Sequence, residues 1–466
     1  MPAPRFQLLA GLAALALGAA PGQPGASPAA QQVTPDQMRG AAYSALEQGG
    51  PQIAYRFSQA LLDRDPTDRD ALFIQSRAAR DMGRYDQAKA SARSAWKLAQ
   101  DDHDKYTSAM LMAQALSSNG QRTMAQLWLR RAVEHAPSEA LERRAINDFR
   151  YVRARNPWLT RISFAVTPDS NINNGSSSRS SFLNYRLSEV LYGQPVEYQL
   201  GGTSVALSGI EYAWGLTTRY RLSETETRAH DVIFTGDLRT YTLSSDAKAL
   251  APDAEGDDFA FGSYTLGYGH RGINLDQRGE YRIAVDLGQS WYGGEEYARF
   301  VRLSTGQSYK LERNRHVNAR VAAERQHGIT TSDSDTIRAD LSYSFRLNTG
   351  AAVWTNLTGA VADSSSATDE FTELALRGQI TFAKPFLGAT AQLGLWARMR
   401  DYDYSPHSND GRHDDRIQAD FTLIFDQIDY HGFNPTMRVS ASRTNSNIGL
   451  YQAERFGVNF GIQSAF

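Results

Sequence analysis

The chain has 466 residues, enough for two to four domains, and its net charge of −2 excludes the strong basic excess typical of nucleic-acid binders. A mean hydropathy of −0.48 is typical of a water-soluble protein, and after the first twenty residues no apolar run is long enough for a membrane-spanning helix. The absence of cysteine excludes disulfides, thiolate metal sites, a cysteine nucleophile and a cysteine-linked lipid anchor.

Residues 1–30 are predicted to be an export signal. Arg5 precedes an apolar run, Leu8 to Leu17, that is too short to span a bilayer. Small residues follow this run, so cleavage is expected between Gly18 and Ala30. The alternative is a buried N-terminal helix. A signal would place the mature chain in the bacterial envelope.

Residues 31–155 are predicted to form tetratricopeptide-like helical repeats. This region is rich in helix-forming Ala, Arg, Gln and Leu. Gly49, Gly83 and Gly120 each precede a helix that begins around Ala54, Ala88 and Ala125, and these alanines are 34 and 37 residues apart. Tetratricopeptide repeats have a 34-residue period. A plain helical bundle is the alternative.

Such stacked helix pairs form a concave binding surface. Residues 31–155 hold 19 Lys and Arg against 15 Asp and Glu, so an excess of positive charge is available to a client. The alternative is an ordinary solvated face. The candidate client groove consists of Arg77, Arg80, Arg84, Arg130 and Arg131.

Residues 156–466 are predicted to form a transmembrane β-barrel. Ile337, Leu341 and Phe345, for example, alternate with polar residues at period two, which indicates strands with one apolar and one polar face. Such segments are about 10–15 residues long, as membrane strands require. We expect fourteen strands, beginning near 158, 204, 228, 258, 279, 296, 314, 335, 351, 371, 389, 415, 435 and 453.

The connections between these segments indicate how the barrel lies in the membrane. Long connections rich in Ser, Asp and Asn, such as 168–203 and 401–414, alternate with mostly shorter ones such as 223–227. Outer-membrane barrels have short periplasmic turns and longer external loops. This asymmetry predicts that residues 31–155 lie in the periplasm. A soluble β-protein is the alternative.

The end of the chain is predicted to carry a barrel-assembly signal. Val458, Phe460, Ile462 and Phe466 are in phase on one face of the last strand. A terminal Phe preceded by alternating apolar residues resembles the assembly signal of outer-membrane barrels. Recognition by the barrel-assembly machinery is therefore expected during biogenesis.

The whole arrangement resembles the surface lipoprotein assembly modulators. After Asn156-Pro157-Trp158 comes a strand and then a run that is similar to the family's segment at the start of the barrel. This run comprises Pro168, Asp169, Ser170, Asn171, Ile172, Asn173 and Asn174. The resemblance implies an outer-membrane protein that binds a client lipoprotein, or a related secreted protein, in the periplasm and helps display it at the cell surface.

Two other function classes remain open at this stage. The first is a passive porin with an accessory periplasmic domain, and the second is an envelope scaffold. Candidate lumen charges are Arg282, Asp286, Arg338, Asp340, Arg346, Arg398 and Asp420, which could simply pair with one another.

No catalytic or cofactor signature is present in the sequence. It contains no HExxH, GxGxxG or P-loop motif. His407, His413, Asp414 and Asp415 fall in or beside a predicted external loop, where such residues are common. We therefore expect no enzyme activity, no cofactor, no metal and no nucleic-acid partner, and contact with outer-membrane lipid.

Overall fold

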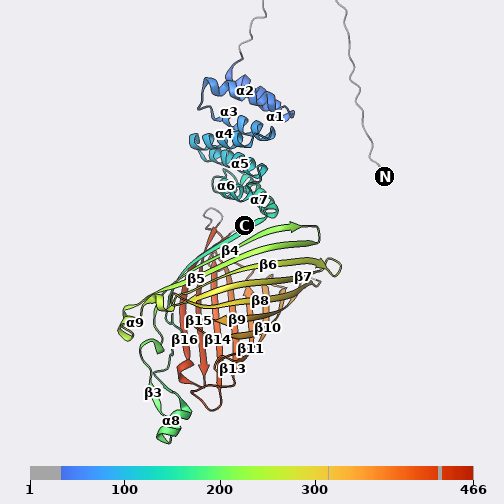
Figure 1. Ribbon diagram of the computed structural model, residues 1–466. Helices are drawn as coiled ribbons and strands as arrows, with labels where there is room; N and C mark the ends of the chain where they lie inside the picture. The colour runs from blue at the N-terminus through green and yellow to red at the C-terminus, as the bar shows by residue number, and fades with distance from the viewer. Residues whose placement is uncertain (1–32, 313, 429–432, 465–466) are drawn as a thin grey trace, which may run out of the picture.

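The computed structural model describes residues 33–312, 314–428 and 433–464, and the predicted export signal lies outside them. Seven helices come first within this described part of the chain, and β1 follows them directly (Figure 1). The helices are α1 (Pro35–Glu47), α2 (Pro51–Arg64), α3 (Arg69–Asp81), α4 (Tyr85–Leu98), α5 (Asp102–Ser118), α6 (Arg122–Glu134) and α7 (Glu139–Arg155). None of the helices in the described ranges combines the length and apolar character needed to cross a bilayer.

The helices stack in antiparallel pairs, as tetratricopeptide repeats do. The predicted alanines Ala54, Ala88 and Ala125 are fully buried on α2, α4 and α6, where their small side chains let neighbouring helices approach closely. Leu129 and Phe149 belong to the main apolar cluster of the stack, which joins α4, α5, α6 and α7. The tetratricopeptide-like prediction is therefore confirmed.

The predicted glycines end the first helix of each pair. Gly49, Gly83 and Gly120 have φ of 75°, 75° and 76°, the left-handed conformation of a helix C-terminal cap. After α3, the Arg84 N–H donates to the Ala79 carbonyl at 2.8 Å, which completes the Schellman pattern. Each glycine therefore turns the chain into the next helix.

Replacing Gly83 with Ala is expected to lower the free energy of unfolding of the helical stack by about 1–2 kcal/mol, because a Cβ atom disfavours positive φ. No atom lies within 4 Å of the position such a Cβ would occupy, so the loss of stability comes from backbone strain and not from a steric clash. Thermal unfolding followed by the helical circular-dichroism signal measures the effect. Gly40→Ala within α1, which has no positive φ, should instead stabilise the stack by about 1 kcal/mol. Equal effects of the two changes would contradict this account.

The rest of the described chain forms a closed antiparallel barrel of fourteen strands, in the order β1-β16-β15-β14-β13-β12-β11-β10-β9-β8-β7-β6-β5-β4. The strands are β1 (Trp158–Asp169), β4 (Gly209–Glu224), β5 (Arg228–Leu243), β6 (Phe261–Asn274), β7 (Gly279–Tyr292), β8 (Glu295–Lys310), β9 (His316–Gly328), β10 (Ser334–Arg346), β11 (Ala352–Ser364), β12 (Phe371–Thr381), β13 (Thr390–Tyr402), β14 (Arg412–Ile424), β15 (Phe433–Ser446) and β16 (Ala453–Ser464). Each begins within about five residues of its predicted start, so the fourteen-strand prediction is confirmed.

The predicted alternation of faces is present around the barrel. Large apolar side chains such as Ile162, Ile337 and Ile417 are 72%, 62% and 64% exposed and form an outward apolar band of the kind that outer-membrane barrels have. Their strand neighbours, such as Arg338 between Ile337 and Ala339, face the lumen. The averaging of these two faces explains the low hydropathy.

The helices and the longer connections lie at opposite ends of the barrel (Figure 1). The helical stack lies at the end where β1 begins, and the opposite end carries β2 (Ser180–Phe182), α8 (Tyr185–Tyr192), β3 (Glu197–Gln199) and α9 (Ser245–Leu250). Three short 3-10 turns, η1 (Gly202–Ser204), η2 (Gly256–Phe259) and η3 (Gly449–Tyr451), also belong to these connections. One connection at that end is a two-residue Gly293-Gly294 hairpin, so the length asymmetry is a trend rather than a rule.

Candidate functional site

A hollow of about 210 Å³ lies over α3, α5 and α7, and Arg80, Gln114, Asp148 and Tyr151 are among the residues that line it. We call this hollow the helical groove. The Arg80 guanidinium donates to the Gln114 side-chain oxygen, which links α3 to α5. Tyr151 is 57% exposed, and its ring lies 3.7 Å from the Arg155 guanidinium carbon. This combination of an exposed aromatic ring and polar side chains suits recognition of a polypeptide.

Burial raises the pKa of the Asp148 carboxyl above its usual 3.8, and Arg144 opposes this shift. Arg80, Gln114 and Asp148 follow one another at intervals of 34 residues, on α3, α5 and α7. The repeat period that predicted the alanines could therefore also have found these groove residues. The sequence reasoning missed Gln114, Asp148 and Tyr151 because it followed positive charge alone.

The structure separates the five predicted groove arginines. Arg80 lines the hollow, and Arg77 is exposed on the same helix. Arg84 lies over the Tyr55 ring at 5.3 Å. Arg131 packs over Trp128 at 4.4 Å, and Arg130 lies between the Phe149 ring and the Phe433 ring of β15, at 5.0 and 4.4 Å. Arg130 therefore connects the helical stack to the barrel.

The predicted run at residues 168–174 begins inside β1 and not after it. Pro168 and Asp169 are the last two residues of that strand, opposite Ile210 and Gly209 of β4. Asp169 is 6% exposed and accepts from Arg455 of β16 at 2.6 Å. Arg455 also bonds Glu211 of β4 at 3.3 Å. This ion-pair group joins β1, β4 and β16 across the place where the barrel closes.

The asparagines that follow hold the chain beside the place where β1 and β16 close the barrel, which we call the seam. Asn171 is 1% exposed; its side chain donates to the carbonyls of Gly175 (2.9 Å) and Glu454 (3.1 Å). Its side-chain oxygen accepts from the Gly175 N–H at 2.9 Å. Asn173 donates to the carbonyls of Thr203 and Val205 and accepts from the Leu207 N–H. Side-chain amides thus provide hydrogen-bond partners for backbone groups that have no neighbouring strand.

The remaining residues of the run complete the same structure. Ser170 accepts from the Phe456 N–H at 2.8 Å, Ile172 is buried against Leu207 and α9, and Asn174 has a φ of 52°. We call residues 168–174 together with Arg455 the seam clamp. Because β1 begins beside α7 and ends at Asp169, and Ile172 packs against α9, the seam clamp lies at the end of the barrel opposite the helices, where Figure 1 shows α9.

The clamp compensates for a short ladder between the first and last strands. β1 pairs with β4 from Trp158 to Asp169, but its described register with β16 runs only from Ala165–Gly461 to Asp169–Gly457. Side chains add to this closure, since Asn459 donates to Thr167 at 2.9 Å. Val458, Phe460 and Ile462 of β16 share the outward face, while Phe466 lies outside the described residues. Their role as an assembly signal stays a prediction.

The lumen carries many charges, and several pair as the sequence allowed. Arg338 bonds Asp340 at 3.1 Å, and the Arg302 Nε bonds Glu324 at 2.7 Å. Arg398 is 3.9 Å from Glu373, a contact that the sequence did not suggest. Within the described part of the chain, no group of three or more His, Asp or Glu side chains is placed to hold a metal ion.

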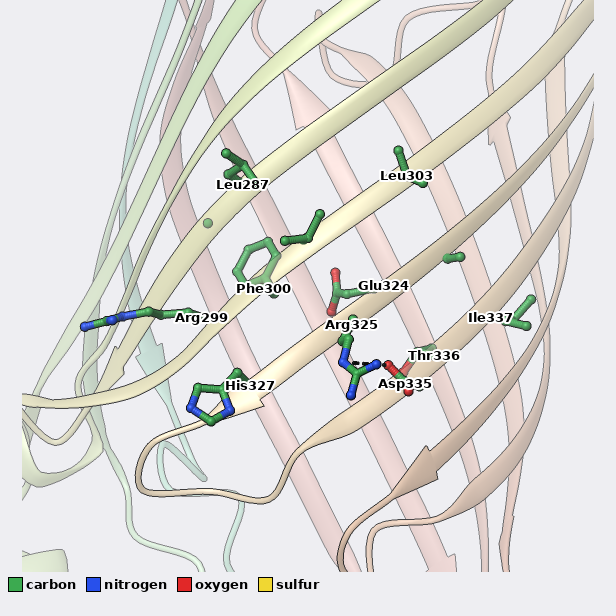
Figure 2. A pocket seen from close by; sticks show the side chains of 13 residues that line it. Leu287, Arg299, Phe300, Leu303, Glu324, Arg325, His327, Asp335, Thr336 and Ile337 are labelled. Atoms are coloured by element: carbon green, nitrogen blue, oxygen red, sulfur yellow. Dashed lines mark ion pairs between the residues drawn. The ribbon is translucent and has the colours of Figure 1, made fainter.

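A shallow hollow of about 820 Å³ lies on strands β7 to β10, and Figure 2 shows its lining. Leu287, Leu303 and Ile337 are exposed apolar residues of the outward band. Arg325 and Asp335, 3.9 Å apart, mark the rim towards the 329–333 turn. An apolar surface with a charged rim is the pattern of a lipid-facing wall. This hollow is therefore part of the outward apolar band.

Helix α8 is tied to the 403–411 connection through a histidine. The Asn184 N–H donates to His407 Nδ1 at 3.0 Å, and the Tyr185 N–H donates to the Pro406 carbonyl at 3.0 Å. Burial, with the Arg412 charge as a smaller cause, lowers the pKa of His407 below its usual 6.5. The contact therefore needs the neutral imidazole.

Acidification is expected to loosen α8. Because the folded-state pKa of His407 is lowered, its contribution to stability is complete above pH about 6.5 and declines as the pH falls towards the folded value. Hydrogen exchange of residues 184–192, corrected for its intrinsic pH dependence, should rise on acidification. The His407→Gln variant keeps an acceptor that does not titrate, so it should lose this dependence; the same pH response in both proteins would contradict the mechanism.

These features define a class of protein, an outer-membrane β-barrel with an N-terminal tetratricopeptide-like domain. The family described as surface lipoprotein assembly modifier matches residues 158–463, and the chain belongs to that family. No curated protein matches the chain.

Solved structures resemble each part separately. The Yersinia enterocolitica type III secretion translocator chaperone SycD is 19% identical over 27% of this chain and 88% of its own, with a TM-score of 0.24. A BenF-like porin from Pseudomonas fluorescens Pf-5 is 7% identical over 66% of this chain and 98% of its own, with a TM-score of 0.33.

Proposed function

We propose that the helical groove binds a specific client in the periplasm and that the barrel helps the client reach the cell surface, without catalysis. The client is a surface lipoprotein or a related secreted protein, consistent with the family to which the chain belongs. The partners are this client, outer-membrane lipid around the barrel and the barrel-assembly machinery during biogenesis.

The attachment of the groove-bearing stack to one mouth of the barrel carries this proposal. Asn156 donates to Thr123 of α6 at 2.9 Å and accepts from the Trp158 N–H at 3.2 Å, so the linker holds the stack and the first strand together. Arg130 adds its contact with Phe433. A client held on α3, α5 and α7 therefore stays tethered beside the barrel, which raises its effective concentration there.

Deletion of the gene in its own bacterium tests the proposal. We expect one or a few lipoproteins or secreted proteins to disappear from the cell surface, measured by protease shaving and mass spectrometry, while their total amount in the cell is retained. A plasmid copy of the full chain should restore them. An unchanged surface proteome would overturn the proposal.

Planar-bilayer recordings distinguish the passive-porin alternative. A large steady conductance in the absence of any client, together with an unchanged surface proteome, would favour a porin with an accessory domain. The proposed function instead predicts that display depends on the helical domain, so a chain lacking residues 35–155 should insert but not restore display.

A further inference from the structure

One wall of the lumen, formed by β11 to β14, carries arginines interleaved with aromatic rings. On β13 the outward residues Leu395 and Met399 are exposed and apolar, so Trp396, Arg398 and Arg400 face the lumen. At the end of this wall nearer the helical stack, Arg377 lies 6.0 Å from the Trp354 ring. Arg377 is also directly opposite Trp396 in the strand register.

Two arginines in the middle of this wall have few partners. Arg398 and Arg416 are opposite each other in the β13–β14 register, and their guanidinium carbons are 5.5 and 5.3 Å from the Trp396 ring. Like charges placed opposite each other repel. The Nε atom of each is buried and has no hydrogen-bond partner within the described structure.

No close ion pair of Arg398 or Arg416 offsets this repulsion within the described structure. Among the described residues Arg416 bonds only the neutral side chains of Gln418 (3.3 Å) and Ser442 (3.1 Å). The carboxylate of Glu373 is 3.9 Å from Arg398 but only 2.8 Å from the Arg400 Nε, which engages it more closely. Among the described residues Arg398, Arg400 and Arg416 have one carboxylate, that of Glu373, within 4 Å, so the middle of the wall carries excess positive charge.

The pattern continues to the mouth at the surface end. The Arg400 guanidinium carbon lies 4.1 Å from the Phe371 ring, and that of Arg412 lies 4.5 Å from Tyr402 and 3.4 Å from Tyr451. We call this series, from Trp354 through Arg398 and Arg416 to Arg412, the arginine track. It extends along β13 between the two mouths of the lumen.

Arginines on other strands of the lumen provide an internal comparison. Arg302 on β8 bonds Glu324, and Arg338 on β10 bonds Asp340. On β4 the Arg221 Nε bonds Asp231 at 2.8 Å, and Arg219 and Arg271 share this carboxylate at 3.8 and 3.7 Å. Unlike Arg416, each of these arginines has a carboxylate within 4 Å among the described residues.

We propose that the arginine track binds an extended, acidic polypeptide segment inside the lumen. An extended peptide rises about 3.3 Å per residue, the same repeat as the strand on which the track lies. Its carboxylates would pair with guanidinium groups, and its other side chains would contact the rings. A single small anion would need one site and not a series from mouth to mouth. The interpretation of the arginine track as a route for the client rests on the proposed function.

Peptide binding to the purified full chain in detergent tests the track. The probes are fluorescein-labelled extended peptides of equal length, containing Glu, Gln or Lys at alternate positions. We expect the Glu peptide to bind in a salt-dependent manner, and the Arg398→Gln/Arg416→Gln variant to bind it at least about tenfold more weakly. The matched control Arg302→Gln/Arg338→Gln, on β8 and β10, should retain affinity within about twofold.

Three results would overturn the proposal. The first is equal affinity for the Glu and Gln peptides, and the second is an equal loss of affinity in both double variants. The third is displacement of the labelled Glu peptide by phosphatidylglycerol micelles more readily than by unlabelled Glu peptide, which would favour a lipid headgroup as the ligand. Heat-dependent gel mobility verifies that each variant folds. If the Arg398→Gln/Arg416→Gln variant does not fold, the single variant Arg416→Gln replaces it in the binding assay. Because this assay uses neither a client nor cells, its failure is separate from a failure of surface display.

Discussion

Replacing Arg455 with Ala is expected to destabilise the barrel by about 3–5 kcal/mol. The change leaves Asp169, whose side chain is 2% exposed, and Glu211, whose side chain is 12% exposed, without the cation that joins them. Breaking a buried ion pair by removing one partner costs this much because the remaining charge stays out of water. The loss falls where the ladder between β1 and β16 is short, so few backbone bonds compensate.

Heat-dependent gel mobility measures this effect as the temperature at which half of the protein unfolds. Arg443→Ala is the matched control, because Arg443 pairs with Glu454 at 3.5 Å on the outward face and both side chains are more than half exposed. Such an exposed pair contributes about 0–1 kcal/mol. If both variants melt at the temperature of the unchanged protein, the seam clamp is not what holds the barrel closed.

The sequence predicted those features that depend on short-range periodicity. Gly83 and Ala88 mark a helix end and a helix contact because the repeat fixes their spacing, and both have the predicted roles. Period-two alternation likewise identified the strands, because successive side chains of a strand point to opposite faces. These patterns are local, so one sequence is enough to detect them.

The sequence did not predict contacts that depend on which strands are neighbours in the barrel. Arg398 and Arg416 become neighbours only through the β13–β14 register, and Asp169 meets Arg455 only when the last strand closes on the first. Asn171 illustrates an intermediate case. Its motif was singled out from the sequence, yet its hydrogen bonds to Gly175 and Glu454 required the closed barrel. Long-range pairing therefore sets the limit of what the sequence predicted.

Replacing Tyr151 with Ala is expected to reduce capture of the client by about 30-fold. Tyrosines that anchor a protein interface contribute about 2 kcal/mol or more, and 1.4 kcal/mol corresponds to a factor of ten. Tyr151 is the exposed aromatic ring of the groove and lies beside Arg80 and Asp148 in its lining. Because more than half of its surface is already exposed, its removal should cost the helical stack little stability. Surface display of the client, quantified by protease shaving, should fall while the barrel remains abundant.

Ile53→Ala is the matched control for this prediction. Ile53 on α2 is 54% exposed, about as much as Tyr151, but it does not line the hollow over α3, α5 and α7. Its loss removes exposed apolar surface from the same helical stack, so a general effect of surface hydrophobicity would appear in both variants. A selective loss in Tyr151→Ala would identify the groove as the receptor. Normal display in Tyr151→Ala would instead mean that the client binds another surface, and the barrel mouth near Arg130 and Phe433 would be the next region to test.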